Sequence, residues 1–238
     1  MKLKKAFKLI IGIVIFITLP SLLLYGFAYF KYNEKLPQGE IGIEADALAT
    51  KMQNALNINA FNNTQYIEFT SLSRRHYEWE KSNDICKIYW KDFKVELNLK
   101  NFDSSAAFIH SFKVTGGQRE KLNKKAIKYF NKDMFWLTAP YQAFKKGVER
   151  KIVKTKDNTN ALLITHPKED NTPIRSYLWI LDSSGKPIAF KMWGPSVLIN
   201  GIEASWSDWT TTESGAQFPT FHKILLFGIG FENIIGTP

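Results

Sequence analysis

Three acidic residues in the second half of the chain are the first candidates for catalytic chemistry. Asp182, Glu203 and Asp208 could meet as paired carboxylates, the arrangement that glycosidases use. Asp182, however, opens the segment Asp-Ser-Ser-Gly, which is common hairpin-turn chemistry. We therefore expect a turn role for Asp182, and a hydrolase is only the third of the functional alternatives considered below.

The residues that bind metals or act as nucleophiles are sparse. The four histidines lie far apart in sequence from one another and from the single cysteine: His76, His110, His166 and His222. A zinc site would have to be assembled entirely by the fold. Cys86 cannot form an internal disulfide and is too far from the N-terminus to carry a lipid anchor, so we predict a small buried side chain.

Sequence motifs of common enzymes are missing. No Gly-x-Ser-x-Gly, His-Glu-x-x-His or phosphate-binding glycine loop occurs. Gly116-Gly117 precedes a predicted helix and could offer backbone amides to an anion, although a plain loop is the simpler interpretation. We expect no catalysis and no cofactor or metal.

The aromatic residues are the most informative feature. All seven Trp follow residue 78. Several aromatic side chains could line a concave apolar pocket for an acyl or other hydrophobic ligand. The alternative is that they only pack a sheet against its helices. The candidate pocket residues are Trp79, Trp90, Phe93, Trp179, Phe190, Trp193 and Trp206.

The positive charge is unevenly spread. The chain carries +10 in total, and residues 113–156 alone hold 13 basic and three acidic side chains. Within them, Gln118–Lys132 has a helical apolar stripe made of Leu122, Ala126, Tyr129 and Phe130. The rest of this predicted helix is basic and would suit anionic lipid or an acidic partner: Arg119, Lys121, Lys124, Lys125, Lys128 and Lys132. A solvated surface helix is the alternative.

Other partners are weighed in the same way. Arg74-Arg75, next to His76, could pair with a headgroup or a carboxylate, or could decorate the end of a strand. Nucleic acid is excluded as a partner because an exported domain seldom meets it and no recognition motif is present.

The N-terminus predicts a membrane anchor. Residues 1–8 hold four lysines, and Leu9–Phe30 follows without a charge. Its 22 residues would span about 33 Å as a helix, enough for the hydrocarbon core. The lysines place the N-terminus inside, so the domain lies on the periplasmic side of the inner membrane. The alternative is a cleaved signal peptide ending near Gly26-Phe27-Ala28.

Hydrophobic periodicity predicts the remaining elements. A polar linker covers residues 31–40 and one domain covers residues 41–232, starting with an amphipathic helix over Glu44–Leu56. Strict alternation over Phe93–Lys100 predicts a strand with one buried face. Further strand patterns are Glu149–Thr155, Ala161–His166, Ser176–Leu181, Pro187–Trp193, Glu203–Thr211 and Phe218–Phe227. Phe135–Pro140 is predicted as a packed crossing between the halves. The fold class is therefore α+β, a curved antiparallel half-barrel with covering helices.

Several second-half segments resemble one family. Leu178–Asp182 through Gly185 and Pro187 to Phe190–Trp193, then Trp206–Trp209, Gly215 and Phe218-Pro219, are similar to the strand pairs of the lipoprotein-carrier (LolA/LolB-like) superfamily. The resemblance covers most of residues 44–227 in pattern. It implies a curved sheet with helices over its concave side and an apolar cavity for acyl chains. Unlike the carriers, this chain has a predicted membrane helix.

The sequence therefore predicts a non-enzymatic, membrane-tethered domain that binds a hydrophobic or lipid-linked ligand. The first alternative is an envelope assembly subunit that binds another envelope protein and no small ligand. The second is the hydrolase already named, on the same scaffold.

Overall fold

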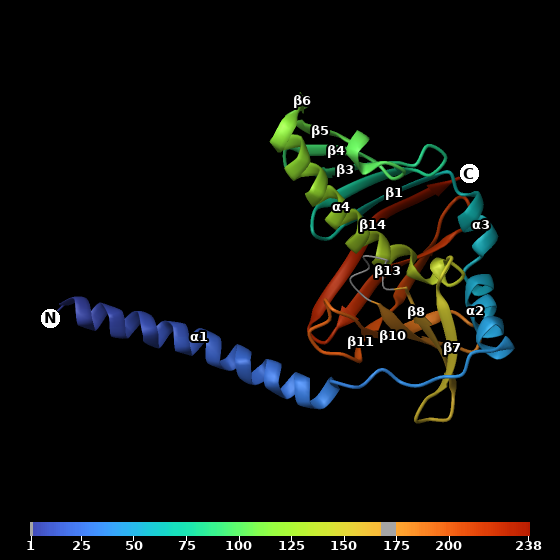
Figure 1. The fold of residues 1–238 in the computed structure, drawn as a ribbon, viewed down its shortest axis with the longest axis horizontal. Helices are drawn as coiled ribbons and strands as arrows, with labels where there is room; N and C mark the ends of the chain where they lie inside the picture. The colour runs from blue at the N-terminus through green and yellow to red at the C-terminus, as the bar shows by residue number, and fades with distance from the viewer. Residues whose placement is uncertain (1, 168–174) are drawn as a thin grey trace.

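A long apolar helix stands apart from the rest of the molecule. The computed structural model describes residues 2–167 and 175–238 and begins with α1, Lys2–Tyr32, which projects away from the other elements (Figure 1). Within it, Phe7–Tyr32 is long and apolar enough to cross a membrane, with a mean hydropathy of 2.4. The predicted apolar helix over residues 9–30 is confirmed as a helix. Met1 of the predicted basic N-terminus lies outside the described residues.

Two antiparallel sheets form the body of the described chain. The larger has the strand order β12-β13-β14-β1-β2-β3-β4-β5-β6 and the smaller β11-β10-β9-β8-β7. The strands are β1 (Tyr66–Ser71), β2 (Arg75–Glu80), β3 (Ile85–Trp90), β4 (Phe93–Asn98), β5 (Ala106–Ile109), β6 (Phe112–Val114), β7 (Glu149–Lys154), β8 (Asn160–Thr165), β9 (Ser176–Leu181), β10 (Pro187–Trp193), β11 (Ile202–Ser205), β12 (Ser207–Thr211), β13 (Gln217–Ile224) and β14 (Phe227–Thr237).

Neither sheet closes into a barrel. The large sheet is curved, and helix α4, Gly116–Thr138, lies across its concave face (Figure 1). The helix α2 (Ile43–Ala55) packs against β7 and β8 of the small sheet and is followed by α3 (Ile58–Asn63). The short 3₁₀ helices η1 (Phe102–Ser104) and η2 (Ala139–Gln142) complete the described elements. This arrangement confirms the predicted α+β half-barrel with covering helices.

Alternation of side chains gives the large sheet two different faces. Along β1 and β3 every second residue is buried. The same holds at Val95 and Leu97 of β4, so the alternation predicted for this strand is confirmed. The buried side faces α4, while the other side carries Glu, Lys and Thr in contact with water.

Three sequence predictions need correction. The segment Phe135–Thr138 is the last turn of α4 and not a separate crossing. The sequence pattern did not indicate this, because every residue from Asp133 to Tyr141 is buried and the helical periodicity is lost. The predicted strand Glu203–Thr211 is two strands, which part at the buried Trp206 and enter different sheets. As a result the second half forms no single continuous sheet.

The third correction concerns the end of the chain. The pattern Phe218–Phe227 predicts one strand, whereas β13 ends at Ile224 and β14 starts at Phe227. β14 was not foreseen, because its sequence contains three glycines and little alternation. It lies between β13 and β1 and so joins the second half of the chain to the first.

Candidate ligand-binding groove

The concave face of the large sheet is almost entirely apolar. Ile67, Trp79, Cys86 and Leu97 lie directly opposite one another on β1, β2, β3 and β4 and so share this face. Ile67, Cys86 and Leu97 are fully buried, whereas the Trp79 ring is only half-buried. Burial raises the pKa of the Cys86 thiol, so the cysteine is an inert core residue, as predicted.

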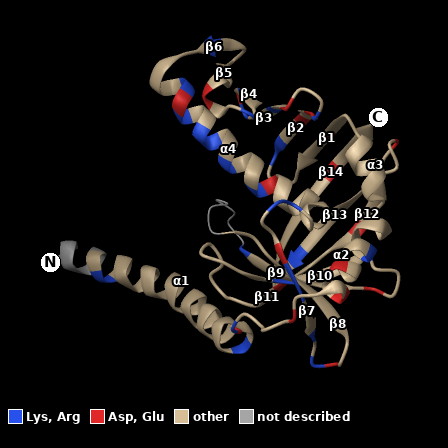
Figure 2. Ribbon diagram, turned by 45° about the vertical axis from the view of Figure 1, so that its right-hand side comes forward, with Lys and Arg blue, Asp and Glu red and all other residues tan. Residues whose placement is uncertain are grey.

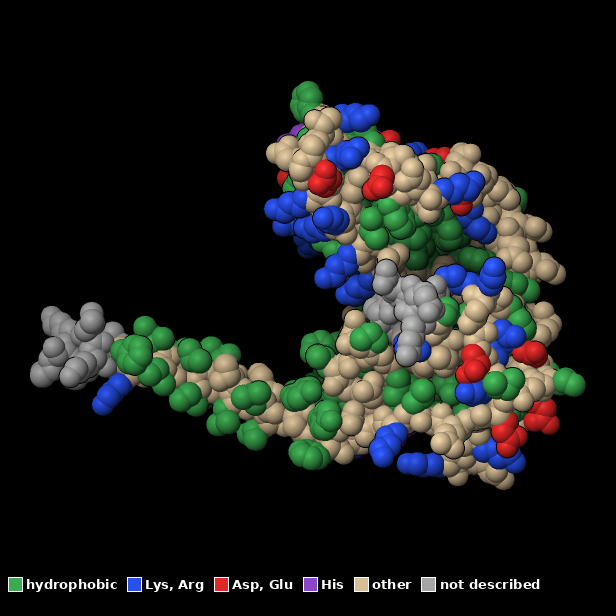
Figure 3. All heavy atoms as spheres, in the orientation of Figure 1, with side chains coloured by type: hydrophobic (Ala, Val, Ile, Leu, Met, Phe, Trp, Pro, Cys, Tyr) green, Lys and Arg blue, Asp and Glu red, His purple; other side chains and the backbone are tan. Residues whose placement is uncertain are grey.

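One helix borders the half-buried Trp79 ring directly. Phe130 of α4 approaches it edge-on, with the ring centroids 6.0 Å apart. Lys81, the residue after the end of β2, places its ammonium 4.3 Å from the Phe61 ring of α3. Figure 3 shows a hollow below the part of the molecule that carries α4, with hydrophobic side chains gathered on its upper wall. We define the groove by Phe61, Trp79 and Phe130, all half-buried.

The Lys81 ammonium lies at the edge of this groove, beside the Phe61 ring. Lys81 donates a hydrogen bond to the Phe61 carbonyl. Partial burial lowers the pKa of its ammonium, because water is displaced from the charged form. An ammonium at this position attracts negatively charged groups.

A buried ion pair holds α4 over the sheet. The Arg75 guanidinium of β2 donates two hydrogen bonds to the Asp133 carboxylate, at 2.8 and 3.0 Å. The Tyr77 hydroxyl donates a third at 2.6 Å, and the guanidinium lies 4.6 Å from the Tyr129 ring. Burial, reinforced by the Asp133 charge, raises the pKa of Tyr77, which therefore stays protonated. The pair is satisfied internally and acts as a clamp between strand and helix.

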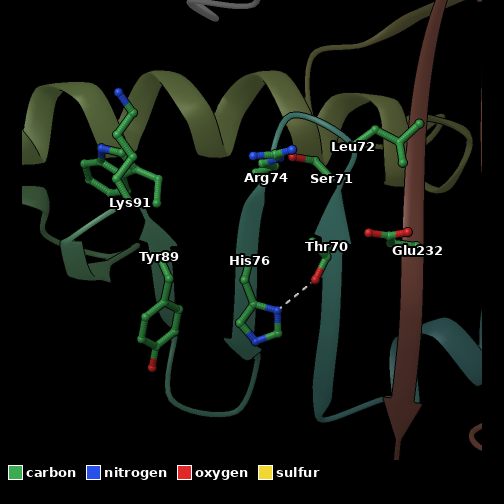
Figure 4. A pocket seen from close by; sticks show the side chains of 9 residues that line it. Thr70, Ser71, Leu72, Arg74, His76, Tyr89, Lys91 and Glu232 are labelled. Carbon is green, nitrogen blue, oxygen red and sulfur yellow. Dashed lines mark hydrogen bonds between the residues drawn. The ribbon is translucent and has the colours of Figure 1, made fainter.

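The side chains of the two consecutive arginines, Arg74 and Arg75, lie at different sites. Arg75 points to Asp133, whereas Arg74 lines a pocket of about 400 Å³ with Thr70, His76 and Tyr89. Figure 4 shows these side chains, with a hydrogen bond of 3.0 Å between the Thr70 hydroxyl and Nδ1 of His76. The pocket also contains Lys91 and Glu232, so its charges are mixed, and it is open to solvent.

Two further predicted pocket residues lie on the same sheet as Trp79. Trp90 and Phe93 are direct partners across the β3–β4 turn, with ring centroids 5.7 Å apart. Trp90 is buried under Tyr129 of α4, at 5.5 Å. Trp90 therefore lies under the middle of α4, at the opposite end of β3 from Cys86, which faces Trp79.

Three other predicted pocket residues form a second, fully enclosed cluster. Trp179, Phe190 and Trp206 are almost completely buried, and their ring centroids are 4.8–5.5 Å apart. Trp136 stacks on Phe190 at 5.5 Å, so α4 enters this cluster too. Their position fits the core interpretation that the sequence left open.

His222 completes that cluster. Its ring lies 4.4 Å from Trp206 and 5.0 Å from Trp136. Burial lowers the pKa of His222 to about 4, because the charged imidazolium would be desolvated. His222 is therefore neutral at pH 7 and packs as an aromatic side chain.

Trp193 lies apart from the other six. It belongs to a small cluster with Val153, Ala161 and Leu178. Its indole N–H donates a hydrogen bond of 2.9 Å to the carbonyl of Glu34, in the linker that follows α1. The seven predicted residues thus lie in three separate places: on the large sheet, in the enclosed cluster and, for Trp193 alone, beside the linker.

The basic face of α4 is in contact with water. Lys121, Lys124, Lys125, Lys128 and Lys132 are all exposed, and Arg119 is half-buried. Figure 2 shows these positive charges along α4. Lys125 also lies 5.7 Å from the Tyr129 ring, which positions its alkyl chain over the apolar stripe.

The candidate catalytic carboxylates do not form a recognisable centre. Asp182 accepts hydrogen bonds from the backbone amides of Ser184 and Lys186, and the Ser184 hydroxyl lowers the pKa of its carboxyl. This is the predicted turn role. Glu203 lies in β11 and Asp208 in β12, which belong to different sheets.

Sequence reasoning missed Phe61, Lys81 and Asp133 as site residues, and placed Phe130 only in the apolar stripe of the predicted helix. Asp133 had a detectable signal, because it continues the apolar stripe of the helix at the spacing of Ala126 and Tyr129. A lone carboxylate on a buried stripe indicates a buried cationic partner. Phe61 carries no comparable signal, because it lies in a six-residue helix without periodicity.

Comparison with known proteins gives no family assignment. No protein-family model matches the chain, and no curated protein matches it. Among solved structures, a DUF1329 family protein from Desulfovibrio piger is similar with a TM-score of 0.41 and 9% identity, covering 81% of this chain and 92% of that one. A domain from Vibrio parahaemolyticus, provisionally assigned to outer membrane lipoprotein sorting, has a TM-score of 0.35 and 8% identity, covering 79% and 93%. The family resemblance inferred from the sequence stays a prediction.

Proposed function

We propose that α1 anchors the protein in a membrane and that the domain, on the extracytoplasmic side, holds a hydrophobic or lipid-linked ligand in the groove. The proposal rests on one observation: the aromatic side chains Phe61, Trp79 and Phe130 are only half-buried, beside a sheet face on which Ile67, Cys86 and Leu97 are fully buried. Exposed aromatic surface in a concavity is typical of sites for apolar ligands.

The groove suits an amphiphile better than a purely apolar molecule. An acyl chain would cover the aromatic walls, while Lys81 at the edge would meet an anionic or polar head. The proposed membrane anchor would keep the groove close to a supply of such molecules. The function would be binding without catalysis, because the charged groups beside the groove, Arg75 and Asp133, are engaged with each other.

Photo-crosslinking in membranes tests this function. Membranes containing the full chain would be loaded with a fatty acid that carries a photoreactive diazirine, irradiated and digested, and the labelled peptides identified. We expect label on α1, which lies in the bilayer in any case, and a second group of labels on β2 and α4 around Trp79 and Phe130. Replacement Trp79→Gln should remove the second group and leave the first.

A matched control comes from the other exposed aromatic side chains. Phe112 is 78% exposed on β6, and the Phe112→Gln variant should leave the labelling unchanged. Label confined to α1 in the parent chain would refute the binding function. Recovery of a stoichiometric protein partner with no label at the groove would favour the envelope assembly subunit instead.

The basic face of α4 extends the proposal to the membrane surface. Its exposed lysines would rest on anionic headgroups and hold the groove near the bilayer. In proteoliposomes, amide hydrogen exchange in α4 should be slower with anionic lipid than with neutral lipid. Replacing Lys124, Lys125 and Lys128 by Glu should abolish that difference. Equal exchange in both lipids, at low salt, would contradict this role.

A further inference from the structure

The linker after α1 is fixed to the small sheet. The Glu34 amide donates a hydrogen bond of 2.7 Å to the Asn200 carbonyl, and the Asn200 amide donates one of 3.1 Å to the Asn33 side chain. Glu34 also forms an ion pair with Lys191 of β10, at 2.8 Å. Together with the Trp193 bond, these contacts determine where α1 leaves the domain.

Close backbone packing supports this attachment. Gly201 has a φ of +82°, and a Cβ there would lie 2.7 Å from the Glu34 side chain. Glu40 exchanges two backbone hydrogen bonds with Ile152 of β7, at 2.8 and 3.0 Å. The linker, residues 33–40, is therefore bound to the small sheet at both of its ends. These contacts fix the point at which α1 leaves the domain.

The loop Gly194–Gly201 reaches back along α1. The Tyr25 hydroxyl donates a hydrogen bond of 3.4 Å to the Leu198 carbonyl. Tyr25 is seven residues before the end of the apolar span at Tyr32, which corresponds to about 10 Å along a helix. A loop beside Tyr25 therefore lies at the depth of the membrane interface whenever α1 spans the bilayer.

The side chains at this level are apolar and exposed. Leu198 is 80% exposed. In the neighbouring β13–β14 turn, Leu226 and Phe227 are 79% and 74% exposed. β11, which follows the loop, lies beside β13, which precedes the turn, and the Lys223 amide of β13 donates a hydrogen bond of 2.8 Å to the Ser205 hydroxyl of β11. Figure 1 shows the β13–β14 turn and β11 on the side of the domain that faces α1.

We propose that the loop Gly194–Gly201 and the turn Leu225–Phe227 insert Leu198, Leu226 and Phe227 into the interface of the bilayer that α1 crosses. The domain then sits on the membrane in one orientation instead of rotating freely on its tether. This inference rests on α1 spanning the membrane, as proposed above, but is independent of what the groove binds.

A lipid surface explains the surroundings of these side chains. Tyr25, Tyr29 and Tyr32 form an aromatic belt at the end of α1, with Lys31 beside Tyr32 and Lys35 just beyond it. Such residues anchor helix ends at the headgroup level. Figure 3 shows that the lysines and arginines over α4 gather on the same side of the domain as α1. Apolar side chains flanked by cations match the chemistry of a bilayer surface.

Depth-dependent fluorescence quenching tests the orientation in the full chain. An environment-sensitive dye would be attached in separate variants, Leu198→Cys, Phe227→Cys, Leu19→Cys and Ile43→Cys, reconstituted into phosphatidylcholine vesicles. Leu19 reports the middle of α1, and Ile43, 88% exposed at the start of α2, is the matched apolar control away from α1. The parent chain gives the background, because its Cys86 is fully buried.

We expect the dyes at Leu198 and Phe227 to emit at shorter wavelength than the dye at Ile43 and to lose intensity with a quencher placed near the lipid headgroups. The dye at Leu19 should respond to a quencher at the acyl-chain ends. If the dyes at Leu198 and Phe227 behave like the dye at Ile43 while the dye at Leu19 is quenched, α1 spans the membrane but the proposed insertion of the loop and turn is refuted. If the dye at Leu19 is not quenched, both the membrane-spanning role of α1 and the insertion are refuted.

Discussion

The two aromatic regions of this protein use the same residue types differently. Around Trp206, the rings of Trp136, Trp179 and Phe190 are enclosed between the small sheet and the strands β12–β14, and almost nothing is exposed. Around Trp79, the large sheet is covered only by α4 and the edge of α3, so a ring stays half-exposed. Aromatic content therefore predicts a core or a groove only when the facing layer is known.

Replacing Trp206 and Trp79 by Ala should give the largest contrast in the free energy of unfolding. Trp206→Ala would leave a large cavity in the enclosed cluster and should lower the free energy of unfolding by roughly 3–5 kcal/mol. Trp79→Ala removes a half-exposed ring and should cost roughly 1–2 kcal/mol. Urea unfolding of the full chain in mild detergent, followed by circular dichroism, measures both. Equal losses would remove the distinction between core and groove.

The clamp at Asp133 lies where α4 passes from one region to the other. Asp133→Asn leaves the Arg75 charge nearly buried and unpaired, so we expect a loss of about 3 kcal/mol in the free energy of unfolding. The double variant Arg75→Met with Asp133→Leu should recover most of it, because no buried charge remains. A double variant as unstable as the single one would show that α4 depends on the ion pair itself.

Acid should weaken the enclosed region through His222. Its pKa falls from 6.5 to about 4 on folding, so the unfolded chain binds a proton first as the pH drops. Stability is complete above about pH 6.5 and decreases toward pH 4, with a loss of roughly 2 kcal/mol between pH 7 and 5. Unfolding of the parent and of His222→Gln at both pH values isolates this contribution. The variant should show a correspondingly smaller decrease, and identical decreases would mean that other groups carry the acid sensitivity.

The smallest effect is expected on the outer side of the small sheet. Lys191 and Glu34 are partly exposed, so Glu34→Gln should lower the free energy of unfolding by less than about 1 kcal/mol. Loss of this ion pair should instead loosen the attachment of α1, so a quencher near the lipid headgroups should quench a dye at Leu198 less strongly in the Glu34→Gln variant. Unchanged quenching would mean that the backbone contacts of the linker are sufficient to hold α1.

Much of the fold was predictable from local pattern. The apolar helix, the helix predicted over Glu44–Leu56, and the alternating strand at Phe93–Lys100 follow from periodicity and are confirmed. The hairpin strands Ser176–Leu181 and Pro187–Trp193 have the predicted boundaries, because turn residues separate them. Each of these elements carries its signal within one short segment.

The remaining features depend on contacts between distant segments. The separation of the two sheets at Trp206 and the place of β14 beside β1 are set by pairing partners, which no local pattern reveals. The groove combines Phe61, Trp79 and Phe130 from three elements, so the sequence could name only Trp79. Trp193 was grouped with the pocket by residue type, while its partner, Glu34, lies in the linker.

The position of β14 has a consequence for biogenesis. β1 leaves the ribosome early, yet the partner on one of its edges is β14, which follows the other described strands in the chain. Until β14 arrives, that edge exposes unpaired backbone groups and can pair with a neighbouring chain. Productive folding therefore requires that β14 reach this edge before a second incomplete chain does, and any step that delays the C-terminal strands would favour aggregation.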